Sequence, residues 1–400
     1  MSQLGPPKAL IGEGDRQSPA QSGGASALYV HWPFCISKCP YCDFNSHVRA
    51  GWDDAAWADA LLADLRHEAE VLGRRPLLSI FFGGGTPSLM PPPTAAAIID
   101  EALRLFDPAP NLEITLEANP SSVEAERFAG FRAAGINRVS LGLQALDDTA
   151  LRFLGRAHCV AEGLAALDIA QRTFPRVSFD LITARPGQGV RAWEAELRRA
   201  LSFGTEHLSL YQLTIEPGTR FQTLHARGEI ALPDEDTAAE LWDVTQALTE
   251  AAGLPAYEIS NHARPGAESC HNLAYWTYGD YAGVGPGAHG RRGGVVTVRH
   301  KKPENWLAAV AECGHGIDDE TALEPVARAE EALLVGLRLT GGLDKTRFAD
   351  RTGLELAAAV RPDAVAELCA LGLLVDTPDR LALTARGRPL LDAVLAKIAA

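Results

Sequence analysis

The sequence predicts an α/β protein, a partial (β/α)6 barrel of the TIM type followed by a C-terminal winged-helix-like cap. Two observations predict this. Six short, nearly continuous apolar runs alternate with segments of helical periodicity, and helical patterns dominate residues 326–400. Strands that alternate with helices pair in parallel through right-handed crossovers. Nearly continuous apolar strands are typical of a sheet that is buried on both faces.

The elements of the predicted barrel follow one another regularly. The six strands are residues 28–34, 77–85, 112–120, 138–144, 177–186 and 207–217. The helices are residues 53–72, 94–106, 122–134, 160–174, 191–203 and 236–252, in which apolar residues recur at helical spacing. Residues 27–254 are therefore predicted to form the barrel core.

The flanking regions have different patterns. Residues 1–26 show no hydrophobic period and are expected to be a disordered tail. Residues 255–325 are rich in Gly, Pro and aromatic residues, with an edge hairpin predicted around Val295–His300. Residues 326–400 predict three helices and a strand pair, the order of a winged helix. Because positive and negative charges balance there, a cap on the barrel is favoured over a DNA-reading wing, which should be basic.

Composition excludes several classes of protein. Hydrophobic residues make up 46% and charged residues 22%, as in ordinary globular proteins. No apolar run is long enough for a transmembrane segment, and no secretory signal is visible. A net charge of −14 argues against a nucleic-acid partner. Seven unevenly spaced cysteines favour a cytoplasmic protein with a metal site over a disulfide framework.

Three of these cysteines form a compact motif. Cys35, Cys39 and Cys42 have CxxxCxxC spacing directly after the first predicted strand. One interpretation is a zinc site that a fourth ligand such as His47 closes. The other is a [4Fe–4S] cluster, which normally takes four thiolates, so that three leave one iron open to a ligand. The motif alone does not decide between the two.

The carboxyl ends of the six predicted strands carry polar or glycine-rich residues. The cysteines follow the first strand and GGGTPS follows the second. The other four strands supply Glu117, Gln144, Asp180 and Thr214. In a (β/α) barrel this rim is where active sites are built. Their convergence beside the cysteines favours a ligand site over six unrelated loop residues.

With YVHWPFC, CxxxCxxC and GGGTPS, the chain resembles the radical S-adenosylmethionine (SAM) superfamily. More narrowly, it resembles the branch that holds oxygen-independent coproporphyrinogen III oxidase and the heme chaperones called HemW. The resemblance covers nearly everything after residue 27. It implies a barrel of the radical SAM type and a [4Fe–4S] cluster on Cys35, Cys39 and Cys42, with SAM bound to the open iron.

The resemblance also implies the residues that contact SAM. These are Tyr29, Gly84, Gly85, Thr86, Glu117, Gln144, Arg156, Asp180, Thr214 and Ala288. Arg156 suits the SAM carboxylate. Glu117 and Asp180 can accept hydrogen bonds from its amino group or its hydroxyls.

Three features favour the chaperone over the oxidase. The oxidase has a further cysteine where this chain has Phe44, and it carries a longer N-terminal region. HNLAYW at residues 271–276 matches the HNxxYW motif of the chaperones. The alternative function is the oxidase itself, which decarboxylates coproporphyrinogen III. A zinc-stabilised winged-helix regulator is a third interpretation, disfavoured by the acidic charge and the glycine-rich turn.

The chaperone resemblance implies a heme site and heme-accepting partners. Its candidate heme contacts are His271, Asn272, Tyr275 and Trp276, since imidazole is a common axial ligand. A half-buried structural histidine is the competing interpretation of His271, and Cys270 is an alternative ligand. The implied partners are heme-requiring apoproteins, including membrane respiratory subunits reached at the inner face of the membrane, and a second copy of the chain in a homodimer.

Overall fold

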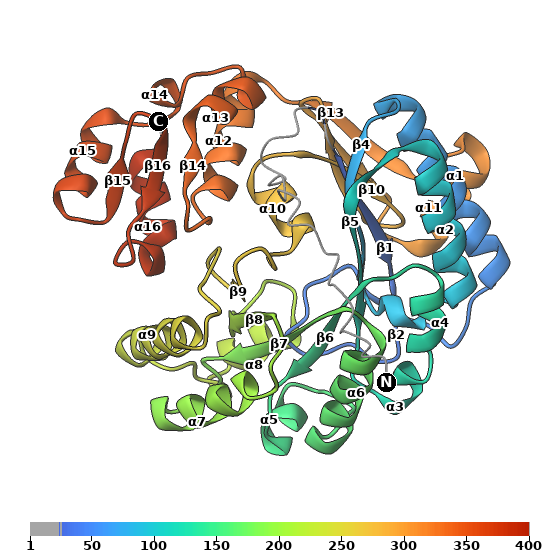
Figure 1. Ribbon diagram of the computed structural model, residues 1–400, viewed down its shortest axis with the longest axis horizontal. Helices are drawn as coiled ribbons and strands as arrows, with labels where there is room; N and C mark the ends of the chain where they lie inside the picture. The colour runs from blue at the N-terminus through green and yellow to red at the C-terminus, as the bar shows by residue number, and fades with distance from the viewer. Residues whose placement is uncertain (1–23, 25, 400) are drawn as a thin grey trace, which may run out of the picture.

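The computed structural model describes residues 24 and 26–399 and confirms the α/β fold class (Figure 1). Within these residues, the parallel strands of the main sheet are β1 (Ser26–Trp32), β4 (Pro76–Gly84), β5 (Asp107–Ala118), β6 (Arg138–Gln144), β7 (Arg176–Thr183), β8 (His207–Gln212) and β10 (Asp280–Val284). Their order is β10-β1-β4-β5-β6-β7-β8. The six predicted strands are thus present, and β10 extends the parallel sheet beyond β1. The predicted tail lies outside the described residues, except for Gly24 and for Ser26, which begins β1.

Helices follow the strands and cover the outer face of the curved sheet (Figure 1). They are α1 (Asp54–Leu72), α2 (Pro92–Leu105), α3 (Ser122–Ala125), α4 (Phe128–Ala133), α5 (Asp148–Phe153), α6 (Val160–Thr173), α7 (Val190–Leu201), α8 (Arg220–Ala226) and α9 (Glu235–Ala251). Leu28 and Val30 of β1 belong to the same core cluster as Leu61 of α1. Because side chains alternate along a strand, Tyr29 and His31 lie on the inner face.

Antiparallel strands extend both edges of the sheet. On one side β10 pairs with β11 (His289–Arg292), followed by β12 (Val295–Arg299) and β13 (Ile317–Ala322); on the other, β9 (Asn261–Ala263) pairs with β8. The predicted hairpin is formed by β11 and β12. However, β13 covers β12, so β12 is not an edge strand. The polar sequence IDDETA of β13 concealed this strand, because most of its residues are exposed. The remaining elements here are the pair β2 (Phe34–Cys35) and β3 (His47–Val48), η2 (Pro87–Leu89), α10 (Cys270–Trp276) and α11 (Pro303–Cys313).

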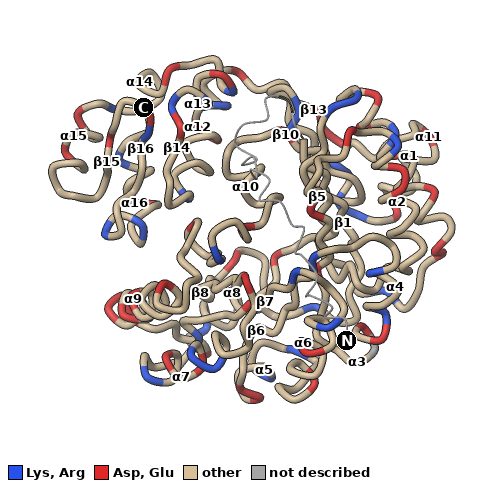
Figure 2. Tube along the Cα trace, viewed as in Figure 1, with Lys and Arg blue, Asp and Glu red and all other residues tan. Residues whose placement is uncertain are grey.

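The C-terminal elements have their own hydrophobic core. They are α12 (Pro325–Gly336), β14 (Leu343–Asp344), α13 (Lys345–Thr352), α14 (Leu356–Ala359), α15 (Pro362–Ala370), β15 (Leu374–Asp376), β16 (Arg380–Leu383), η3 (Arg388–Leu390) and α16 (Leu391–Ile398). Helices with a small sheet of order β14-β16-β15 agree with a winged-helix-like arrangement. Acidic and basic residues are interspersed along this part of the chain (Figure 2). No helix among the described residues is both long and apolar enough to span a bilayer.

Candidate functional site

The cysteine loop follows β1 and meets two hydrogen-bond donors from other elements. Cys35, Cys39 and Cys42 are all free thiols and partly buried. The Thr86 hydroxyl donates to Cys35 Sγ at 3.4 Å, and Arg156 Nη1 donates to Cys39 Sγ at 3.4 Å. Donors of this kind stabilise sulfur that carries negative charge. The surroundings of the loop therefore suit thiolate ligands.

Burial raises the pKa of the Cys35 and Cys42 thiols. Both are therefore protonated at neutral pH until a metal displaces the proton. His47 is engaged elsewhere, because its Nε2 lies 3.2 Å from both Asn45 Oδ1 and the Lys301 carbonyl oxygen. In residues 24 and 26–399, no three Cys, His, Asp or Glu side chains surround one point as ligands of a single ion would. Three thiols spaced along a loop suit a multinuclear cluster, whose irons are bound by separate thiolates.

The glycine-rich turn at the end of β4 packs tightly against β1 and β2, the strands that lead into the cysteine loop. A Cβ on Gly84 would lie 2.7 Å from the His31 ring, and a Cβ on Gly85 would lie 2.8 Å from the Phe34 carbonyl oxygen. Gly84 also has a φ of +115°, which side chains rarely adopt. Its N–H donates to Glu117 Oε2 at 3.3 Å. Glycine is therefore required here, and the turn brings the end of β4 beside the cysteines and Glu117.

Two carboxyl groups lie on the inner face of the sheet at the rim. Burial, with the nearby charge of Asp180, raises the pKa of Glu117 to about 8. Burial raises the pKa of Asp180 to about 6, although hydrogen bonds with Ser209 and Ser140 act in the opposite direction and lower it. Near neutral pH the ligand-free protein therefore keeps Glu117 mostly protonated, whereas Asp180 is mostly ionised although its anion is less stable than in water. A cationic or hydroxyl-bearing ligand would stabilise their ionised forms.

Arg156 connects the carboxyl ends of β5 and β6 with the cysteine loop. Its Nη2 donates to Asn119 Oδ1 at 2.5 Å and to the Gly142 carbonyl at 3.0 Å. Asn119 in turn donates to the Thr86 hydroxyl at 3.1 Å. The buried Nε of Arg156 has no hydrogen-bond partner in the part of the chain that is described. A guanidinium with an unused N–H suits a carboxylate ligand. Asn119 was missed from the sequence, where an amide two residues after Glu117 carries no distinguishing pattern.

Three other predicted SAM contacts, Gln144, Thr214 and Ala288, have different surroundings. Gln144 has a φ of +65°, and a Cβ on Gly142 would lie 2.9 Å from Gln144 Nε2 and 3.3 Å from Arg156 Nη2. The side chains of Gln144 and Arg156 therefore both lie against Gly142. The positive φ of Gln144 is a strained backbone conformation of the kind that is typical of functional sites. Thr214 is exposed after β8, and its side chain makes no hydrogen bond with another described residue. Ala288 is fully buried between β10 and β11.

A hydrogen-bonded chain joins Tyr29 to the loop before Ala288. The Tyr29 hydroxyl lies 3.0 Å from His31 Nδ1, and His31 Nε2 lies 2.9 Å from the Asn45 carbonyl. Asn45 Nδ2 donates to the Pro286 carbonyl at 2.9 Å. Burial lowers the pKa of His31 to about 4, so the ring is neutral. This chain fixes the cysteine loop between β1 and the strand that begins the antiparallel extension.

The HNLAYW segment forms most of α10, which lies between the C-terminal elements and β1, β4 and β5 (Figure 1). His271 Nδ1 lies 3.2 Å from the Ser79 hydroxyl, and its ring stacks on Phe81 at 4.8 Å. The ring is also 6.1 Å from that of Tyr29. Burial lowers the pKa of His271 to about 4. His271 therefore points toward the inner face of β4, deeper in the barrel than the cysteines.

The other three motif residues face different neighbours. Asn272 Nδ2 donates to the Tyr257 hydroxyl at 3.1 Å. Tyr275 packs on Trp276 at 4.9 Å, and the Arg338 guanidinium lies 4.5 Å from the centre of the Trp276 ring. Both aromatic residues also pack against the C-terminal core. The motif thus joins the barrel to the C-terminal elements and does not meet the cysteine loop.

Comparisons with known proteins agree with this architecture. Residues 29–200 match the model of the radical SAM superfamily, and residues 323–390 match the HemN C-terminal domain. The structure of coproporphyrinogen III oxidase (HemN) from Escherichia coli superimposes with a TM-score of 0.77 at 22% identity, covering 94% of this chain and 91% of the oxidase chain. This likeness shows a shared fold. The barrel and its rim thus define a radical SAM protein.

Curated relatives narrow the assignment. Heme chaperone HemW of Mycobacterium tuberculosis is 38% identical over 95% of this chain and 98% of its own length. Heme chaperone HemW of Bacillus subtilis is 34% identical over 90% and 96%. The bovine mitochondrial "Radical S-adenosyl methionine domain-containing protein 1" is 42% identical over 82% and 77%. The chain belongs to the HemW family of the radical SAM superfamily, which overturns the interpretation as a zinc-stabilised regulator.

Proposed function

We propose that this protein is a heme chaperone that binds a [4Fe–4S] cluster, SAM and heme and delivers heme to heme-requiring apoproteins. The observation that carries the proposal is the similarity to proteins named heme chaperone HemW over almost the whole of both chains. Phe44, at the position where the oxidase has a further cysteine, and the HNLAYW segment support the chaperone over the oxidase.

In this proposal Cys35, Cys39 and Cys42 hold the cluster. When bound, the cluster supplies one electron that can cleave SAM to methionine and a 5′-deoxyadenosyl radical. The donors from Thr86 and Arg156 stabilise the charge on two of the sulfurs. The fit rests on three free thiols, these two donors and the unpaired Nε of Arg156.

The remaining rim residues orient SAM in the proposed complex. Arg156 binds the carboxylate, and Glu117 and Asp180 accept from the amino group or the ribose hydroxyls. Binding a cation favours the ionised form of Glu117, whose pKa of about 8 leaves it mostly protonated near pH 7. Gly84 and Gly85 permit close approach of the backbone. Tyr29, Thr86, Gln144, Thr214 and Ala288 complete the proposed contacts.

The proposal extends to the location and partners of the chain. The acceptors are apoproteins that require heme, including respiratory subunits at the inner face of the membrane, and the chaperone itself works in the cytoplasm. The homodimer belongs to the same proposal. Size-exclusion chromatography with light scattering of the reconstituted protein tests it, and a monomer at micromolar concentration would contradict it.

The test of the function is anaerobic reconstitution with iron and sulfide, followed by two assays on the same preparation. Titration with heme, followed by its Soret absorption, should show stable binding, and transfer to an apo-hemoprotein should follow. Incubation with SAM, reductant and coproporphyrinogen III should give no protoporphyrinogen. Measurable decarboxylation would establish the oxidase instead.

A further inference from the structure

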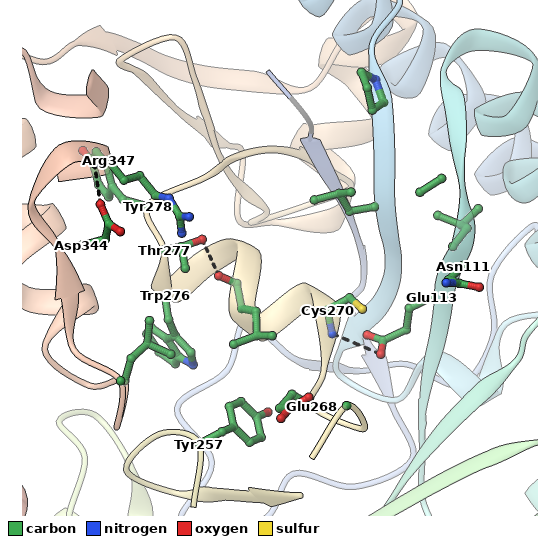
Figure 3. Close-up of a pocket in the computed structure, with 18 of the residues that line it drawn as sticks. Asn111, Glu113, Tyr257, Glu268, Cys270, Trp276, Thr277, Tyr278, Asp344 and Arg347 are labelled. Carbon is green, nitrogen blue, oxygen red and sulfur yellow. Dashed lines mark hydrogen bonds between the residues drawn. The ribbon is translucent and has the colours of Figure 1, made fainter. Parts of the chain in front are cut away.

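A large cleft opens at the end of the barrel opposite to the cysteines. Its volume is about 1750 Å³, and it lies between the amino ends of β4, β5 and β7, helix α10 and the C-terminal elements α12 to α13 (Figure 3). Pockets for drug-sized ligands usually measure roughly 300–1,000 Å³. The cleft is therefore large enough for a broad ligand, and the SAM contacts proposed above do not line it.

One side of α10 forms a wall of this cleft. Cys270, Leu273 and Trp276 line it at a spacing of three residues, so they share one helical face. His271 does not line it, because its ring points to Ser79 and Phe81 inside the barrel. The only side chain of this face that can ligate iron is thus the Cys270 thiol. The buried indole nitrogen of Trp276 has no hydrogen-bond partner among the described residues.

The start of α10 is held firmly against the barrel. The buried carboxylate of Glu113 accepts hydrogen bonds from the Ser269 hydroxyl and from the N–H groups of Cys270 and His271. It also pairs with Arg176 at 2.8 Å. The position of Cys270 in the cleft is therefore fixed before any ligand binds, which reduces the entropic cost of binding.

On the side of the C-terminal elements the lining includes two arginines beside Asp344, and elsewhere it holds Arg176 with the acidic residues Asp107, Glu113, Glu206 and Glu268. The two arginines are Arg347 of α13 and Arg380 of β16. Burial and the charges of Arg351 and Arg380 lower the pKa of Arg347, while Asp344 opposes this effect. Cations held this close together favour a bound carboxylate, which guanidinium groups recognise well. Tyr257 and Phe348 add further aromatic rings to the lining.

We infer that this cleft is the heme site, with the macrocycle against Cys270, Leu273 and Trp276 and the propionates at Arg347 and Arg380. This inference rests on the proposed heme-chaperone function. A broad apolar disc with an iron centre and two carboxylates at one edge matches a wall of apolar and aromatic residues, one facing thiol and two arginines. Cys270, rather than His271, is the iron-facing residue of the HNLAYW region.

The test is heme titration of the full-length, cluster-loaded protein by Soret absorption and electron paramagnetic resonance. Cys270→Ser should shift the Soret band and remove a thiolate-type ferric signal, with Cys369→Ser as the matched control. Arg347→Gln combined with Arg380→Gln should weaken heme binding by about tenfold or more, the usual size of a lost charged hydrogen bond. Arg386→Gln, a C-terminal arginine that does not line the cleft, is the control. Heme dimethyl ester, which lacks the carboxylates, should bind the double variant and the wild type equally.

Circular dichroism and thermal unfolding establish that each variant is folded, and Leu273→Trp adds a variant that fills the cleft without removing charge. If the wild type binds heme and no cleft variant changes that binding, the assignment of heme to the cleft is wrong, but the proposed chaperone function is not contradicted. Absence of heme binding by the wild type would instead remove the proposed function and this inference with it.

Discussion

The two ends of the barrel differ in what they offer a ligand. At the carboxyl rim, glycines permit backbone contact, and Arg156, Glu117 and Asp180 present ionisable groups in partly buried positions. At the amino end, the cleft is wide and combines apolar and aromatic side chains with arginines and carboxylates near its borders. The rim therefore suits a compact, charged cofactor, and the cleft suits a broad and mostly apolar one. One sheet can hold both because they use opposite ends of the same strands.

His271 lies between the two ends and links them. Its ring contacts Phe81 and lies 6.1 Å from Tyr29 of the rim, while Cys270 beside it lines the cleft. Experiments that separate the effects at the two ends test this comparison directly.

The largest effect is expected at the cysteine loop. Replacing Cys35, Cys39 or Cys42 by Ala should reduce the iron content from about four per chain to nearly none, since a cubane needs its thiolates. Iron analysis and the visible spectrum after anaerobic reconstitution measure this. Cys159→Ala and Cys369→Ala are the controls and should retain the cluster. Stoichiometric zinc without iron uptake in the wild type would contradict the cluster.

A smaller effect is expected for SAM binding. Glu117→Ala and Asp180→Ala should each weaken it by about 1–3 kcal/mol, the usual loss for a hydrogen bond to a charged group. Titration of the reduced, cluster-loaded protein with SAM, followed spectroscopically, gives the dissociation constants. Heme affinity should be unchanged in both variants, because neither residue lines the cleft. Equal SAM affinity in wild type and both variants would place SAM elsewhere.

The sequence predicted the rim far better than the cleft. Apolar strands alternating with helices bring strand ends together at one edge, so Glu117 and Asp180 could be placed beside the cysteines from the chain's pattern alone. The assignment of Arg156 as a SAM contact came only from the family resemblance, because this residue lies after α5 and not at a strand end. The strand β10 was missed since its five residues include glycine and lack alternation. The cleft forms between segments that are far apart in the sequence, such as those of Glu113, Cys270 and Arg347. No local sequence pattern indicates that these segments come together.

A further prediction concerns pH and the rim. The pKa of Glu117 in the folded protein is about 8, above its ordinary value of 4.5. The folded state therefore binds more protons than the unfolded state between these values. Its stability contribution is complete below about pH 4.5 and is lost as the pH rises through about 8. Glu117→Gln should raise the Tm of the SAM-free protein at about pH 9 and change it little at about pH 5. Thermal unfolding at both pH values measures this. A Tm difference of equal size at both would mean that ionisation of Glu117 does not destabilise the folded protein.

The smallest expected effect distinguishes the barrel interior from the cleft. His271→Ala removes one hydrogen bond with Ser79 and the stacking on Phe81. Together these should lower the free energy of unfolding by about 1–2 kcal/mol. Because its imidazole points away from the cleft, the Soret band of the heme complex should keep its position. Chemical denaturation and heme titration of the same sample measure both quantities. A shifted Soret band in His271→Ala, with none in Cys270→Ser, would place the iron inside the barrel, close to Tyr29, and both cofactors would then share one cavity.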